Sequence, residues 1–248
     1  MRAHTSLEQA DAPCSAATQL AVEQRLFDSL TPALQHLRIW QPLPALIVTT
    51  AEARTPTFAA AAARAENRGL PVCVRGSGGG TVCLGPGMLV VAHLYTSLRN
   101  DIDGSYREFA GRLKQAISSL GASVVEAHVP TAYCDGKFDL ACDGAKVGGI
   151  AQRRRRVGGG VNVWIHAVLA VERTCLRYPQ AVADFYSDMG SSRLADPRST
   201  TCLSECRAPN MSASDLLSRC AAAIADQFRE ASAAQPTLVR QSPLTLSG

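Results

Sequence analysis

Residues 131–154, with the sequence TAYCDGKFDLACDGAKVGGIAQRR, form the most informative stretch of the chain. Within it, Cys134 and Lys146 flank a short apolar segment that turns at Asp143-Gly144. Asp-Gly pairs favour tight hairpin turns, so the hairpin is expected to bring the two side chains together. A thiol can carry an acyl group, and an ammonium can steer its carbonyl oxygen. The stretch therefore predicts a hairpin that holds the parts of an acyl-transfer site.

Lys146 is followed closely by Gly148 and Gly149, and glycine weakens a strand unless something must approach closely. The pair therefore predicts a binding surface beside the lysine. Two simpler interpretations remain open at this point. Cys134 could be a small buried hydrophobic residue, and Lys146 could be an exposed lysine that protects a sheet edge.

A second candidate site is the loop Arg75-Gly76-Ser77-Gly78-Gly79-Gly80, between two extended segments. Consecutive glycines let a ligand approach the backbone, whose N–H groups can face an anion or a carbonyl oxygen, and Arg75 adds positive charge. The loop lacks the Lys-Ser/Thr ending of a Walker loop, and no helix follows it directly as a dinucleotide fingerprint requires. A flexible hairpin tip is the alternative interpretation.

Composition narrows the class of protein. Of the 248 residues 46% are hydrophobic and 19% charged, which predicts a globular chain with a sizeable core. The net charge of +4 is modest, and four arginines are concentrated at Arg153–Arg156, which argues against a nucleic-acid-binding protein. We expect that run to be a solvated loop or a docking patch for an acidic protein.

The localisation expected from the sequence is cytoplasmic. No window approaches the roughly 20 apolar residues that span a bilayer, and residues 1–17 lack the apolar core of a secretory signal. The nine cysteines are irregularly spaced, which favours reduced thiols over a disulfide framework. No metal site is expected, because Cys202 and Cys206 have no second ligand pair nearby.

Hydrophobic periodicity predicts an α+β fold with a mixed sheet. We expect a flexible leader over residues 1–17, a single catalytic domain over 18–231 that ends in a helix, and a flexible tail over 232–248. Helices are predicted at 18–30, 57–67, 105–120 and 214–231, strands at 37–40, 45–49, 71–75, 81–84, 88–94, 124–127, 137–142, 146–152 and 161–171, and irregular structure at 178–212.

The pattern from Tyr133-Cys134-x-Gly136-x-x-Asp139-Leu140 through Gly144-x-Lys146-x-x-Gly149-Ile150-x-Gln152-Arg153-Arg154 resembles the signature of the lipoate/octanoate protein ligase and transferase family. Within that family it is most similar to the branch that moves octanoyl groups between proteins by amidotransfer. Leu20-Ala21-Val22-Glu23, Leu37-Arg38-Ile39-Trp40 and the glycine loop occur in the family's order. The resemblance covers roughly residues 18–230.

The resemblance implies a largely antiparallel mixed sheet flanked by helices, like that of biotin protein ligases, with an acyl tunnel beside the glycine loop. It implies that Cys134 carries the octanoyl or lipoyl group as a thioester and that Lys146 binds the acyl carbonyl. The residues implied to bind substrate are Arg75, Ser77, Gly78, Gly79, Gly80, Gly148 and Gly149.

The implied donor is an octanoylated or lipoylated carrier, either the glycine-cleavage H protein or acyl carrier protein. The implied acceptors are lipoyl domains of 2-oxoacid dehydrogenases, with no nucleic-acid or membrane partner. No cofactor is expected, because exchange of one amide for another is close to thermoneutral, and ATP would be needed only by a ligase.

The sequence departs from the family pattern in two places beside the expected site. Asp135 stands where the most similar branch carries proline, and Cys83-Leu84-Gly85 replaces the His-Asp pair of the ligases. The second departure favours a transferase. Two alternatives stay open: an ATP-dependent lipoate–protein ligase, and a non-catalytic module that binds acyl-proteins or nucleotides on the same fold.

Overall fold

The computed structural model describes residues 4–9, 12–206 and 215–234. The strands are β1 (His4–Gln9), β2 (Leu34–Trp40), β3 (Ala45–Thr49), β4 (Val72–Arg75), β5 (Val82–Leu84), β6 (Met88–Ser97), β7 (Val125–Glu126), β8 (Leu140–Cys142), β9 (Ala145–Val157) and β10 (Gly160–Ala170). The longer helices are α1 (Ala16–Asp28), α2 (Phe58–Asn67), α3 (Ile102–Ser119), α4 (Tyr178–Asp188) and α5 (Leu216–Ala234).

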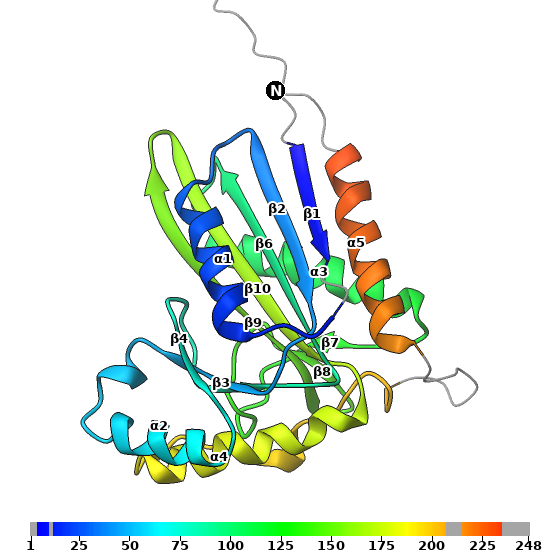
Figure 1. The fold of residues 1–248 in the computed structure, drawn as a ribbon. Helices are drawn as coiled ribbons and strands as arrows, with labels where there is room; N and C mark the ends of the chain where they lie inside the picture. The colour runs from blue at the N-terminus through cyan, green and yellow to red at the C-terminus, as the bar shows by residue number, and fades with distance from the viewer. Residues whose placement is uncertain (1–3, 10–11, 207–214, 235–248) are drawn as a thin grey trace, which may run out of the picture.

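The strands form two sheets (Figure 1). Seven strands make the larger sheet, in the order β1-β2-β6-β10-β9-β8-β7, and every pairing except that of β1 with β2 is antiparallel. The smaller sheet has the order β4-β3-β5, with β3 parallel to β4 and antiparallel to β5. This architecture confirms the expected mixed, largely antiparallel sheet flanked by helices.

Helices cover both faces of the larger sheet (Figure 1). On one face, α3 and α5 pack through apolar residues at helical spacing, among them Leu113, Ile117 and Ile224. Asp101 caps the start of α3, because its carboxylate accepts the Gly104 amide at 2.8 Å. On the other face, Phe27 of α1 packs beside Trp164 of β10.

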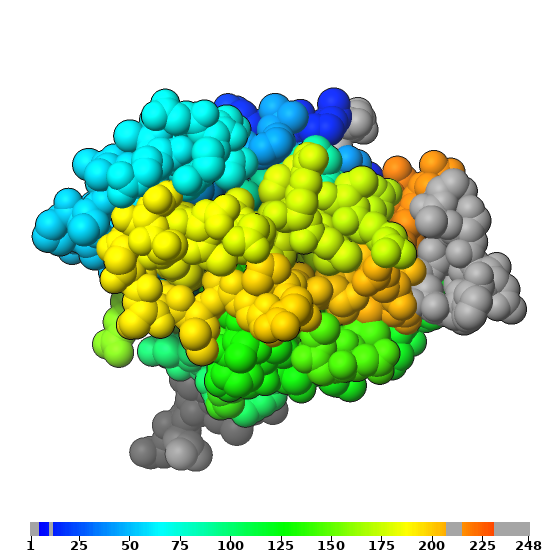
Figure 2. All heavy atoms as spheres, turned by 90° about the horizontal axis from the view of Figure 1, so that it is seen from below, coloured from blue at the N-terminus to red at the C-terminus, as the bar shows by residue number. Residues whose placement is uncertain are grey.

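The smaller sheet packs against α2 and α4 in a second core. Seen from below, residues 178–205 (yellow to orange) run across the surface between the α2 region (cyan) and the segment around residues 120–150 (green) (Figure 2). The amide of Asp196 donates to the Thr131 carbonyl at 2.8 Å, and that of Thr201 to the Lys146 carbonyl at 2.9 Å. The segment after α4 therefore connects the smaller sheet and its helices to the β8–β9 side of the larger sheet.

The predicted hairpin of the opening stretch is confirmed as β8 and β9. Cys142 pairs with Ala145 across the tight turn, and Ala141 pairs with Lys146. The first strand is shorter than the predicted 137–142, because residues 136–139 form a turn in which the Asp139 amide donates to the Gly136 carbonyl at 3.3 Å.

Two other expectations about local structure were wrong. Residues 4–9, expected in a flexible leader, form β1, which gains its backbone partners from β2. Residues 178–188, expected to be irregular, form α4, whose buried face includes Val182 and Phe185. The final helix extends to Ala234, and residues 235–248 of the expected tail lie outside the described residues.

The arginine run is not the expected solvated loop, because it continues β9. Strand alternation sends Arg153 and Arg155 towards α1, where their guanidinium groups lie 5.5 and 4.9 Å from the centroid of the Phe27 ring. Arg154 points towards the start of α3 and donates to the Ser105 hydroxyl at 2.9 Å. These three side chains attach helices to the sheet. Among the described helices, none combines the length and the hydropathy that crossing a membrane requires.

Candidate functional site

Cys134 lies in the loop between β7 and β8, close to the glycine loop that joins β4 to β5. Its φ angle is +45°, in the left-handed region that residues with side chains rarely adopt. Tyr133 before it is buried, whereas Cys134 is half-buried. A backbone in this conformation needs neighbouring contacts that hold it in place.

Lys146 supplies those contacts from β9. Its Nζ atom donates to the carbonyl oxygens of Tyr133 at 3.0 Å and of Cys134 at 2.7 Å, and it forms an ion pair with Asp139 Oδ2 at 2.8 Å. The side chain is buried, so the interpretation as an exposed edge lysine is excluded. Gly149 leaves room for it, because a Cβ atom there would lie 3.0 Å from Nζ.

Asp139 is the buried partner of that ammonium. Its carboxylate also accepts the Gly136 amide at 2.9 Å and so closes the turn after Cys134. Burial raises the pKa of Asp139, although the charge of Lys146 opposes the increase. The structure thus brings Cys134 and Lys146 together as predicted, but the ammonium contacts the backbone of the cysteine.

The sulfur of Cys134 faces two donors. The Gly80 amide donates to Sγ at 3.1 Å, and Nη2 of Arg75 lies 3.5 Å from it. Gly79 has a φ of +108°, and a Cβ atom there would lie 2.9 Å from the sulfur. The loop therefore needs glycine at this position. An N–H group and a guanidinium are thus directed at the same sulfur.

Arg75 is itself held from several sides. Its guanidinium donates to the Gly80 carbonyl at 2.8 Å and to the Ser77 hydroxyl at 3.2 Å, and Nη1 lies 3.3 Å from Nε2 of His166. Because arginine can only donate, that imidazole nitrogen must accept and carry no proton. Burial and the charge of Arg75 lower the pKa of His166 to about 3, so the ring is neutral.

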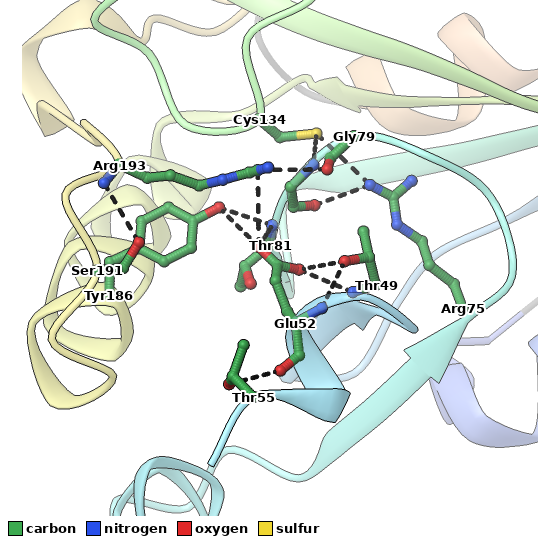
Figure 3. A network of polar contacts seen from close by, with 11 residues as sticks. Thr49, Glu52, Thr55, Arg75, Gly79, Thr81, Cys134, Tyr186, Ser191 and Arg193 are labelled. Carbon is green, nitrogen blue, oxygen red and sulfur yellow. Dashed lines mark hydrogen bonds and ion pairs between the residues drawn. The ribbon is translucent and has the colours of Figure 1, made fainter. Parts of the chain in front are cut away.

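A buried carboxylate supports the glycine loop from below (Figure 3). Glu52 accepts the amide and the hydroxyl of Thr49, both at 2.8 Å, and the amide of Thr81 at 3.1 Å. The hydroxyl of Tyr186, from α4, also accepts the Thr81 amide at 2.8 Å and donates to Glu52 at 3.2 Å. The end of the loop is thereby tied to both β3 and α4.

Arg193, in the segment after α4, completes this group of residues (Figure 3). Its Nη1 atom donates to the Gly79 carbonyl at 3.3 Å and lies 3.7 Å from Oε1 of Glu52. Its side chain is 53% exposed, so it borders the solvent beside the half-buried Cys134.

A small pocket bordered by Arg75 lies between α1 and the two sheets. Its lining is mostly aliphatic and comprises Leu20, Glu23, Trp40, Ile47, Arg75, Val82, Leu84, Val90, His166 and Val168. Its volume is about 30 Å³, room for one or two water molecules. An acyl chain could enter only if the lining side chains moved apart.

Glu23 is the acidic residue of this apolar lining. Its carboxylate accepts the indole N–H of Trp40 at 2.9 Å and lies 3.7 Å from the guanidinium of Arg38. Burial raises the pKa of Glu23 from about 4.5 to about 7, because the two partners compensate only part of the lost hydration.

This carboxyl predicts a pH dependence of stability. Between pH 4.5 and pH 7 the folded chain holds a proton on Glu23 that the unfolded chain releases. The free energy of unfolding should therefore fall as pH rises through this range, by about 3 kcal/mol from this group. Glu23→Gln cannot ionise, so its free energy of unfolding should show a correspondingly flatter slope.

Urea unfolding at several pH values between 5 and 8 measures this difference. Glu66→Gln, on the exposed side of α2, is the matched control and should keep the wild-type slope. Parallel curves for Glu23→Gln and wild type would show that Glu23 does not titrate in this way.

Most of the chain matches a known protein family. Residues 15–225 match the model of the lipoyl protein ligase A/B catalytic domain. The chain belongs to this family. The resemblance seen in the Cys134–Lys146 stretch is therefore confirmed.

Several relatives of this chain have assigned names. The octanoyl-GcvH:protein N-octanoyltransferase of Macrococcus caseolyticus is 30% identical over 151 residues, which cover 60% of this chain and 54% of that protein. The chain spans about half the length of the curated relatives it matches.

Solved structures of lipoate protein ligases share the fold. A lipoate-protein ligase A bound with ATP superimposes with a TM-score of 0.69 at 17% identity, covering 93% of this chain and 85% of the other. The bi-partite lipoate protein ligase of Thermoplasma acidophilum, described with its E2 lipoyl domain, gives 0.65 at 17%, covering 93% and 83%. At these identities the likeness supports the family fold.

Most of the predicted site residues lie together. Cys134, Lys146, Arg75, Ser77, Gly79 and Gly80 are linked by the contacts described above. Gly78 has open space at its Cβ position. Gly148 faces β10, where a Cβ atom would lie 2.7 Å from the Leu169 side chain, so its small size serves strand packing.

Several residues of the site were not singled out from the sequence. Asp139 and Glu23 lay inside the quoted family motifs without an assigned role. The others come from distant parts of the chain and carry no local signal: Glu52, His166, Tyr186 and Arg193.

Proposed function

We propose that this chain is an acyltransferase that moves an octanoyl or lipoyl group from a carrier protein to a specific lysine of a lipoyl domain, through a thioester on Cys134. One observation carries the proposal. The sulfur of Cys134 meets the Gly80 amide and the Arg75 guanidinium, and Arg75 also lines the apolar pocket. Arg75 thus lies both beside the proposed nucleophile and in the wall of an apolar pocket.

In the first half-reaction the Cys134 thiolate attacks the amide carbonyl that links the acyl group to the donor lysine. A carbon–sulfur bond forms, and negative charge moves onto the carbonyl oxygen. The Gly80 N–H and Arg75, which lie 3.1 and 3.5 Å from the sulfur, stabilise that charge. The carbon–nitrogen bond then breaks, and the leaving lysine amine takes up a proton, which leaves a thioester on Cys134.

In the second half-reaction the neutral amine of the acceptor lysine attacks this thioester. Its carbon–nitrogen bond forms, the carbon–sulfur bond breaks, and the Cys134 thiolate is released to the same two donors. The proton lost by the acceptor lysine balances the proton gained by the donor lysine. One amide replaces another, so no nucleotide is consumed, and the kinetics are ping-pong.

Lys146 supports this chemistry in two ways. It holds the left-handed backbone of Cys134 and thereby directs the sulfur towards the glycine loop. It also places a buried positive charge beside the reacting cysteine. To bind the acyl carbonyl itself, the ammonium would have to release one of its three bonding partners. Two of these, the backbone carbonyls of Tyr133 and Cys134, are uncharged, and the third is the Asp139 carboxylate.

The acyl chain occupies the pocket between Arg75 and Glu23. The aliphatic lining suits an octanoyl chain, but its volume of about 30 Å³ is far below the roughly 300 Å³ of a small-molecule site. Binding therefore opens the pocket. The partners of the proposed reaction are a glycine-cleavage H protein or acyl carrier protein as donor and a lipoyl domain as acceptor. The names of the relatives, which include that carrier, support the first choice of donor.

Transfer without nucleotide tests this function. The protein is mixed with octanoylated glycine-cleavage H protein and an unmodified lipoyl domain, and the mass of the lipoyl domain is followed with and without ATP. We expect octanoylation of the acceptor at the same rate in both mixtures. Modification that requires free octanoate or lipoate together with ATP would assign a ligase, and binding of the donor without transfer would assign a non-catalytic module.

A further inference from the structure

The peptide group between Gly79 and Gly80 is bonded at both ends (Figure 3). Its carbonyl accepts a hydrogen bond from Nη1 of Arg193 at 3.3 Å. Its N–H donates to the sulfur of Cys134 at 3.1 Å. One planar unit therefore connects an arginine of the segment after α4 to the proposed nucleophile.

The geometry of a peptide group makes this connection directional. A trans peptide is planar, and its C=O and N–H bonds point in opposite directions. Fixing the carbonyl towards Arg193 therefore fixes the N–H towards Cys134. A cationic donor on the carbonyl also polarises the peptide, which strengthens the hydrogen bond given by its N–H.

The next peptide group, between Gly80 and Thr81, is also hydrogen-bonded at both ends. The Gly80 carbonyl accepts from Arg75, and the Thr81 amide donates to Glu52 and Tyr186. Gly80 itself has no space for a side chain, because a Cβ atom there would lie 2.5 Å from Arg193 Nη1 and 2.6 Å from the Tyr186 hydroxyl oxygen. Among these contacts, the hydrogen bond from Arg193 is the one that holds the Gly79 carbonyl. That carbonyl belongs to the peptide whose N–H faces the sulfur.

We propose that Arg193 is a positioning residue that acts through the Gly79–Gly80 peptide to orient and polarise the N–H group facing the Cys134 sulfur. The relevance of this to acyl transfer rests on the proposed function. The effect of Arg193 on the thiol does not rest on that function, because the contacts exist in the free protein. The same Nη1 atom lies 3.7 Å from Oε1 of Glu52, and this ion pair helps to hold the guanidinium in place.

The reactivity of the Cys134 thiol tests this role without any acyl substrate. The rate of alkylation by iodoacetamide is measured from pH 6 to 10 by quantifying the Cys134 peptide, which separates it from the other eight cysteines. Arg193→Met keeps the aliphatic stem and removes the charged donor. We expect its rate near neutral pH to fall about twofold, and its pH profile to move to higher pH.

Two further variants complete the experiment. Arg198→Ala removes a 90% exposed arginine from the same segment, which pairs with Asp196 and leaves the glycine loop untouched. It should alkylate as wild type does. Arg193→Lys restores a cationic donor and should recover part of the lost rate. Thermal unfolding should change little in all three, since these side chains are largely exposed.

A wild-type rate and pH profile in Arg193→Met would overturn the proposal, as would an equal loss in Arg198→Ala. Failure of the proposed function has a different signature. In that case no donor acylates Cys134, while the alkylation rates still separate the Arg193 and Arg198 variants.

Discussion

Replacing Cys134 with alanine is expected to reduce octanoyl transfer by roughly a thousandfold or more, to the level of the uncatalysed exchange. The thiol is the group that carries the acyl chain between the two lysines, and the alanine methyl group cannot form an ester or a thioester. The change should leave the fold intact. The side chain is half-buried, and the alanine retains the backbone contacts with Lys146.

The assay compares initial rates of acceptor octanoylation at equal protein concentration. Cys14→Ala is the matched control, because it removes another half-buried thiol, which bonds to the Ala12 carbonyl at 3.1 Å, before α1. It should retain the wild-type rate. Transfer by Cys134→Ala within tenfold of wild type would mean that the acyl group moves without a Cys134 thioester.

Replacing Lys146 with methionine is expected to abolish transfer and also to destabilise the fold. Methionine fills a similar volume, but it leaves Asp139 buried without its cation and removes the donors to the carbonyls of Tyr133 and Cys134. Breaking a buried ion pair from one side costs about 3–5 kcal/mol. Asp139 can relieve part of this cost by taking up a proton, which its raised pKa already favours.

Because Lys146 is buried and paired with Asp139, its removal affects folding as well as transfer. A second change at Asp139 separates the two effects. The double variant Lys146→Met/Asp139→Asn carries no unpaired buried charge, so its urea midpoint should return towards wild type. Its transfer rate should stay at background. A folded double variant that transfers at the wild-type rate would show that Lys146 has no part in the reaction.

The elements predicted correctly from the sequence are those with strong local signals. The β8–β9 hairpin follows from apolar residues around Asp143-Gly144, and the buried stripe of α3 from the helical spacing of Phe109, Leu113 and Ile117. Cys134, Lys146 and the glycine loop were identified because their spacing carries the family pattern. The match over residues 15–225 confirmed that pattern.

What the sequence did not predict depends on tertiary contacts. The helix α4 has only a short apolar stripe, and its packing against the smaller sheet stabilises it. The arginine run looked like a solvated loop, because its partners Phe27 and Ser105 lie far away in the chain. Tyr186 and Arg193 reach the glycine loop across more than a hundred residues, so no local pattern could indicate them.

The most direct test of the central claim is the mass of the intact protein after incubation with an octanoylated donor in the absence of acceptor. We predict a mass increase of one octanoyl group, located on Cys134 by peptide analysis and removed by hydroxylamine, as expected of a thioester. The adduct should also disappear when an unmodified lipoyl domain is added, and the acceptor should gain the same mass. Rapid transfer to the lipoyl domain with no adduct on Cys134 under any donor condition would contradict the thioester mechanism.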